Sequence, residues 1–101
     1  MKLIIEKPLK TYMEEENLSG IVLEVGECIA CGGGYKNVNA YFLKEKGEID
    51  ESKYFIEESE VGKIYFPKEG ILYGDTVRLV WKSYYWEGLG VSGAKAIQEK
   101  N

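Results

Sequence analysis

Two cysteines in the first third of the chain have the spacing of many metal-binding and redox cysteines. Cys28 and Cys31 are separated by two residues, and residues 32–34 are all glycine. Two thiolates at this spacing can bind one Zn²⁺ ion, but a structural zinc site takes four protein ligands. The chain offers two cysteines and no histidine, so a zinc site would need carboxylates or a second subunit to complete its ligands.

Two other interpretations of the cysteine pair remain open. A redox pair normally opens a helix within a β-α-β unit, whereas the glycines after Cys31 disfavour a helix. A stable disulfide is typical of oxidising compartments or of hyperthermophiles. The third interpretation gives Cys28 and Cys31 a purely structural role, and we favour it. Zinc at this pair is therefore the one cofactor considered, and otherwise none is expected.

A second group of residues combines aromatic rings, basic groups and amides on three expected strands. Because side chains alternate between the two faces of a strand, all of them are expected to point outward. Bases of single-stranded nucleic acid stack on such rings, at about 1–3 kcal/mol each, while cations contact the phosphates. The sequence therefore predicts a nucleic-acid-binding surface made of Asn37, Asn39, Tyr41, Lys53, Phe55, Arg78, Lys82, Tyr84 and Trp86.

The same rings have an alternative interpretation. Tyrosine and tryptophan are also enriched at subunit interfaces, and such rings can cover the edge of a core or pack against the N-terminal segment. Glu57, Glu58 and Glu60 lie close to the third expected strand and argue against a path for phosphates there. A protein partner or a homo-oligomer therefore stays open beside nucleic acid.

Residues that commonly serve acid–base or nucleophilic catalysis are scarce in this chain. It has no histidine and no G-x-S-x-G motif around a nucleophilic serine. Its neighbouring carboxylates, such as Glu57 and Glu58, stand in charged segments that are normally solvated. The sequence therefore predicts a protein that is not an enzyme.

Net charge and hydropathy narrow the class of protein further. Thirteen basic and seventeen acidic side chains give a net charge of -4, so nucleic acid could bind only through a local basic patch. No apolar run approaches the roughly 20 residues of a membrane-spanning helix, and Glu6 comes too early for a signal peptide. We expect a cytoplasmic protein without a membrane segment, and its many Glu and Lys residues are typical of thermophiles.

These candidate residues must be positioned by strands, because β-branched and aromatic residues recur in short alternating runs bounded by turn residues. Strands are expected at residues 20–26, 35–43, 53–57, 64–66, 76–86 and 89–97. At 101 residues the chain fits a single domain, with 1–17 as an N-terminal extension packed on a barrel of 18–98. The alternation predicts a core of Ile21, Leu23, Val25, Val38, Phe42, Val77, Leu79 and Trp81.

The layout of these strands resembles the oligonucleotide/oligosaccharide-binding (OB) fold. The first strand reads SGIVLEVG, and Gly74-Asp75-Thr76-Val77-Arg78-Leu79 is similar to the entry of the family's fourth strand. The family has a helix between its third and fourth strands, whereas residues 58–73 contain an extended run at 64–66. The resemblance implies an all-β, five-stranded barrel with an added N-terminal segment, and an SH3-like barrel is the alternative.

The resemblance also implies where a ligand would lie. OB domains bind oligomers across their second and third strands. We therefore expect a noncatalytic binding module for single-stranded nucleic acid, with added contacts from Arg78, Lys82 and Trp86. The alternatives are a protein-interaction or oligomer-forming barrel, and a metal or redox role for Cys28 and Cys31.

Overall fold

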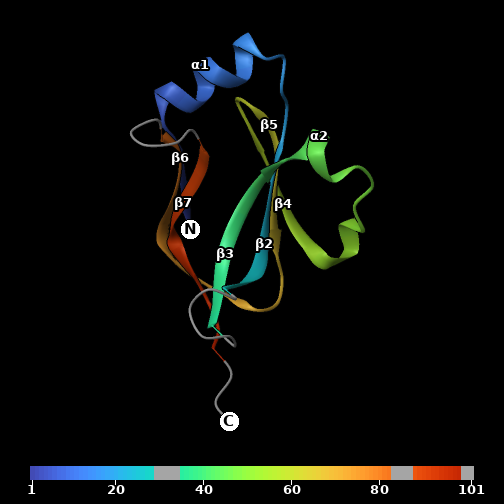
Figure 1. Cartoon of the computed structure of the whole chain (residues 1–101), viewed down its shortest axis with the longest axis vertical. Helices are drawn as coiled ribbons and strands as arrows, with labels where there is room; N and C mark the ends of the chain where they lie inside the picture. The colour runs from blue at the N-terminus through green and yellow to red at the C-terminus, as the bar shows by residue number, and fades with distance from the viewer. Residues whose placement is uncertain (29–34, 83–87, 99–101) are drawn as a thin grey trace.

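The fold consists mainly of β-strands, in agreement with the prediction of an all-β protein. A computed structural model describes residues 1–28, 35–82 and 88–98 (Figure 1). The elements in chain order are β1 (Lys2–Ile5), α1 (Lys7–Glu15), β2 (Ile21–Cys28), β3 (Tyr35–Phe42), α2 (Leu43–Lys46), the 3-10 helix η2 (Glu51–Lys53), β4 (Tyr54–Ser59), β5 (Gly62–Pro67), β6 (Ile71–Lys82) and β7 (Gly88–Ala96).

The strands of the described residues form two open sheets, which corrects the expectation of one closed barrel. One sheet has the order β1-β6-β7, with β1 parallel to β6, and the other has the order β3-β2-β5-β4. Strands β3 and β7 lie side by side, where the Gln98 side chain bonds both backbone groups of Lys36. At the opposite side β1 and β4 are terminal strands of different sheets, and no hydrogen-bonded ladder joins them.

In the sequence, residues 2–6 and 9–13 look extended and residues 13–17 could hold a helical turn. The structure instead has the strand β1 followed by the helix α1. Pro8 stands in the first turn of α1, where its missing N–H costs nothing. Leu9 and Met13 are four residues apart on one face, and both are fully buried. The helix ends in a Schellman motif, in which Asn17 has a φ of 53° and the Leu18 N–H donates to the Met13 carbonyl.

The helices of the described residues are short. The longest of them, α1, has nine residues, and Figure 1 shows it at one end of the two sheets. No helix in this part of the chain is long and apolar enough to span a membrane.

The core lies between the two sheets and is closed by α1. Of the expected core residues, five are buried, namely Ile21, Leu23, Phe42, Val77 and Leu79. Val38 and Trp81 are partly buried against them, whereas Val25 is 37% exposed. Val25 lies beyond the part of β2 that pairs with β5, because that ladder covers only Ile21 and Val22.

The second sheet corrects the expected orientation of β4. The sequence placed Phe55 outward and Ile56 inward. Phe55 instead pairs with Phe66, which is buried in the core, and Ile56 pairs with Tyr65. Directly opposed residues of an antiparallel pair share a face, so Phe55 lies on the core side of the sheet at its free edge. Its side chain is still 59% exposed, because β4 is a terminal strand.

Candidate functional site

Three residues of the predicted nucleic-acid surface lie together on the outer face of β3. Asn37 and Asn39 stand opposite Gly26 and Glu24 of β2, and Tyr41 stands opposite Val22. Both amides lie against Gly26, where an added Cβ would come within 2.9 Å of the Asn37 Oδ1 atom. That oxygen is buried and has no hydrogen-bond partner among the described residues. These amides therefore pack on the sheet and do not extend into solvent.

The Tyr41 ring already has a cation above it. The Lys46 Nζ atom of α2 lies 4.7 Å from the centre of this ring and 2.9 Å from the Glu24 Oε2 atom. The hydrogen bond to Glu24 raises the pKa of Lys46 above its ordinary value. Because Lys46 contacts this ring within the chain, Tyr41 is a poorer stacking platform for a base than its exposure suggests.

The other predicted site residues lie elsewhere. Lys53 ends η2, and Phe55 of β4 lies at the opposite edge of the sheet from β3, with β2 and β5 between them. Arg78 and Lys82 are exposed on β6 in the other sheet. The Arg78 Nη1 atom is 3.0 Å from the Glu6 Oε2 atom. The described members of the predicted set therefore lie on separate parts of the two sheets.

Several of the predicted residues lie outside the described part of the structure. Tyr84, Trp86 and Cys31 are among them, and the side chain of Cys28 is not described either. In the described ranges no group of three or more His, Cys, Asp or Glu side chains could hold a metal ion. The hypotheses for these four residues therefore stay predictions.

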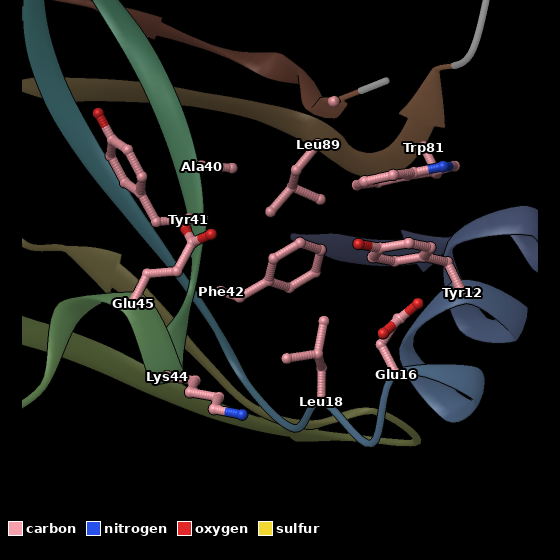
Figure 2. Close-up of a pocket in the computed structure, with 11 residues that line it drawn as sticks. Tyr12, Glu16, Leu18, Ala40, Tyr41, Phe42, Lys44, Glu45, Trp81 and Leu89 are labelled. Carbon is pink, nitrogen blue, oxygen red and sulfur yellow. The ribbon is translucent and has the colours of Figure 1, made fainter. Parts of the chain in front are cut away.

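Three aromatic rings from three different elements meet at a cleft that the sequence did not indicate as a whole, although Tyr41 of the predicted surface also lines it. Tyr12 of α1 stacks on Trp81 of β6, with ring centres 3.8 Å apart and planes 14° apart (Figure 2). Phe42, at the end of β3, is tilted against both rings at 5.8 and 6.0 Å. Aromatic pairs of this kind contribute about 0.5–1.5 kcal/mol beyond the area they bury. The rings therefore also attach α1 to both sheets.

The cleft beside these rings has a volume of about 420 Å³. Its other apolar lining comes from Leu18, Ala40 and Leu89. Charged side chains line the cleft as well, and these are Glu16, Lys44 and Glu45. The cleft therefore combines aromatic and aliphatic side chains with charged groups of both signs.

Sequence reasoning missed this cleft for two reasons. Trp81 was assigned to the core, whereas it is only partly buried, and Tyr12 was placed in an extended segment. The signal that would have found Tyr12 is the helical spacing of Leu9 and Met13, which places residue 12 on the neighbouring flank of the same helix.

Comparisons with known proteins do not add a family to this picture. No family model, curated protein or solved structure matches the chain. The function is therefore argued from the residues and their geometry.

Proposed function

We propose that this protein is a noncatalytic binding domain of OB-like architecture, and that its ligand is single-stranded nucleic acid. A base of the ligand enters the aromatic cleft. One observation carries the proposal: Tyr12, Phe42 and Trp81 converge from three elements on the wall of a cleft of about 420 Å³. Bases stack on such rings whatever their sequence, at about 1–3 kcal/mol each.

Charged groups near the rings give this ligand further contacts. Lys44 lines the cleft, and Lys82 follows Trp81 on β6 with its side chain exposed. Two lysines supply a small local attraction for phosphates although the chain is net acidic. Carboxylates accept hydrogen bonds from the exocyclic amino groups of bases. Glu16 and Glu45 therefore favour cytosine, adenine or guanine over thymine and uracil.

The test is fluorescence anisotropy with labelled oligonucleotides of a single base type at low ionic strength. Oligo-dC and oligo-dA are expected to bind more tightly than oligo-dT, and binding should weaken as salt is added. With two lysines near the cleft, the slope of log K against log salt is expected to be about -1 to -2. The proposal would be contradicted by the absence of binding at protein concentrations of roughly tens of micromolar, or by an affinity that does not change with salt concentration.

Variants locate the binding site on the surface. Trp81→Leu is expected to weaken binding about 5- to 150-fold, the equivalent of one stacked base. Lys82→Glu should also weaken it, whereas Lys95→Glu, the same charge change at the far end of β7 from Leu89, should have a smaller effect. Circular dichroism checks that each variant is folded. Equal effects of the two lysine variants would place the ligand away from the cleft.

A further inference from the structure

The two sheets leave an open seam between β1 and β4, their terminal strands on one side of the molecule. Two clefts with volumes of about 440 and 250 Å³ lie along it and share Glu57. Leu3 and Ile5 of β1 line the smaller cleft with the end of β4. The side chains of the larger cleft are mostly apolar, and they belong to Met1, Phe55, Ile56, Glu57, Phe66 and Tyr73.

The backbone of β1 turns hydrogen-bonding groups toward this seam. The Glu6 N–H donates to the Leu79 carbonyl of β6 at 3.0 Å. Successive residues of a strand point their backbone groups to opposite sides, so the N–H and C=O groups of Leu3 and Ile5 point away from β6. Among the described strands, none pairs with this side of β1.

The backbone of β4 also turns hydrogen-bonding groups toward the seam, from the side opposite β1. The Lys68 N–H donates to the Lys53 carbonyl at 3.0 Å. This bond shows which residues of β4 have their backbone groups turned toward β5 in the antiparallel ladder. By alternation Phe55 and Glu57 bond to β5, and the backbone groups of Ile56 and Glu58 point to the free edge. Both edges of the seam therefore present donors and acceptors to an extended chain.

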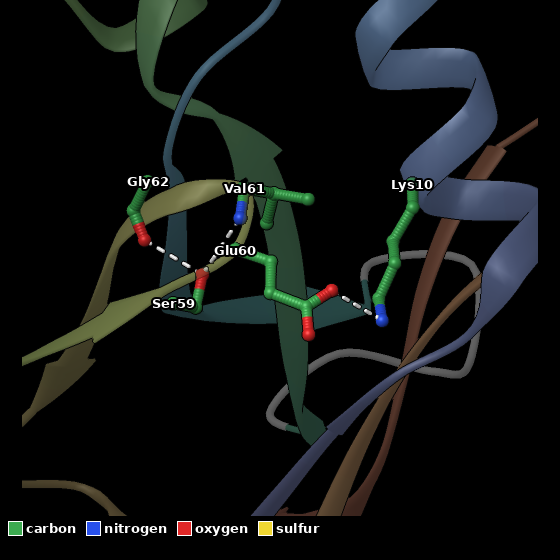
Figure 3. A network of polar contacts seen from close by, with 5 residues as sticks. All are labelled: Lys10, Ser59, Glu60, Val61 and Gly62. Carbon is green, nitrogen blue, oxygen red and sulfur yellow. Dashed lines mark hydrogen bonds and ion pairs between the residues drawn. The ribbon is translucent and has the colours of Figure 1, made fainter.

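Charge divides the seam into two halves. Phe55 and Ile56 lie at one end, where the Lys68 Nζ atom is 5.7 Å from the centre of the Phe55 ring. Glu57 and Glu58 lie toward the other end without an ion pair among the described residues. That end is bounded by an ion pair of 2.6 Å between the Lys10 Nζ and Glu60 Oε2 atoms (Figure 3). A second acidic strand is disfavoured here, while a basic one is attracted.

We infer that the β1–β4 seam binds an extended segment of a partner protein that carries basic residues at one end and alternating apolar residues beyond them. The basic residues face Glu57 and Glu58, and the alternating apolar side chains lie on the core face, where they cover Phe55. The backbone of the segment bonds to both edges, which is the mode of strand addition. The six residues of β4 span about 20 Å at ~3.3 Å per residue, which sets the length of the bound segment.

A second copy of this chain fits the seam less well than a basic segment. Pairing of β4 with β4 of another copy would bring two sets of Glu57, Glu58 and Glu60 together. Like charges that face each other across a strand pair are destabilising. This inference concerns a different surface from the aromatic cleft, so each proposal can fail without the other.

The probe for this site is a capped synthetic peptide with two lysines followed by alternating threonine and valine, matched in length to β4. We expect saturable binding by isothermal titration calorimetry and chemical-shift changes in β1 and β4. N-methylation of either set of alternate amides in the peptide is expected to abolish binding, because each set faces one edge of the seam. Full binding by either methylated peptide would overturn insertion between the two edges.

Variants of the protein provide the matched comparison. Phe55→Ser should weaken peptide binding about tenfold. Leu72→Ser, at a side chain that is 64% exposed and lines neither cleft, should leave it unchanged. Ile56→Pro removes a donor from the free edge only, and a loss of about fivefold is expected. The inference is overturned if the peptide does not bind, if both serine variants behave alike, or if light scattering shows a dimer that Phe55→Ser dissociates.

Discussion

Replacing Leu9 by alanine is expected to destabilise the whole fold and not only the N-terminal helix. The Leu9 side chain is fully buried in the core cluster with Met13 of the same helix and Leu79 of β6. Leucine-to-alanine changes at such positions cost about 2–5 kcal/mol, through lost burial and the cavity that remains. For a chain of this size a loss of about 3 kcal/mol lowers Tm by roughly 12–24 °C.

Urea unfolding followed by circular dichroism measures this loss, and Leu72→Ala is the control. Leu72 is 64% exposed on β6, so its truncation should change the free energy of unfolding by no more than about 0.5 kcal/mol. One cooperative transition with an unchanged slope is expected for both variants. A loss below about 1 kcal/mol for Leu9→Ala would refute the reasoning, because α1 would then be a peripheral element and a poor wall for the aromatic cleft.

Three further outcomes are expected. Burial raises the pKa of the Tyr73 hydroxyl to about 12. In the unfolded chain the tyrosine pKa is about 10, so this hydroxyl ionises at lower pH in the unfolded state than in the folded state. The free energy of unfolding should therefore fall by about 1–2 kcal/mol as pH rises from about 10 to about 12, a range that already allows for partial exposure. Urea unfolding of Tyr73→Phe across this pH range should show a smaller fall, and part of it should remain because the pKa values of Tyr54 and Tyr65 are raised as well. Lys46→Met should lower stability at low salt, and a double-mutant cycle with Glu24→Gln should assign part of this loss to their ion pair. Gly93→Ala should lower the free energy of unfolding by about 3 kcal/mol or more. Gly93 has a φ of 83°, and an added Cβ would collide with the Thr76 carbonyl oxygen. An unchanged Tm in thermal unfolding would contradict this packing.

Alternation along the strands predicted part of this fold well. Ile21 and Leu23 in β2, and Val77 and Leu79 in β6, were expected to point inward, and all four are fully buried. Both strands have neighbours on both sides, and in β6 the exposed Arg78 separates Val77 from Leu79, so the period of two is clear there. In β2 the intervening Val22 is fully buried as well, so burial alone does not separate the two faces of that strand. The all-β class follows from the same signal.

Alternation along the sequence does not show which strands pair, so features that depend on pairing could not be predicted from it. The orientation of Phe55 is set by its partner Phe66. Alternation could not indicate this orientation, because β4 has exposed side chains on both faces. The helix α1 was missed because Leu9 and Met13 give only two anchoring positions in nine residues. The cleft was missed with it, since Tyr12 reaches Trp81 only when α1 is a helix docked on the core.

The open seam raises a problem that the acidic residues of β4 help to solve. An exposed edge with apolar side chains such as Phe55 invites pairing with other copies of the same chain. Glu57 and Glu58 beside it repel an identical strand, and the same two charges attract a basic one. Because Lys10 neutralises Glu60 at the end of the seam, the charge that remains is concentrated where an incoming strand would lie. Protection against self-association and selection of a basic partner therefore require the same residues, so reversing their charge should exclude the basic peptide and favour an acidic one in its place.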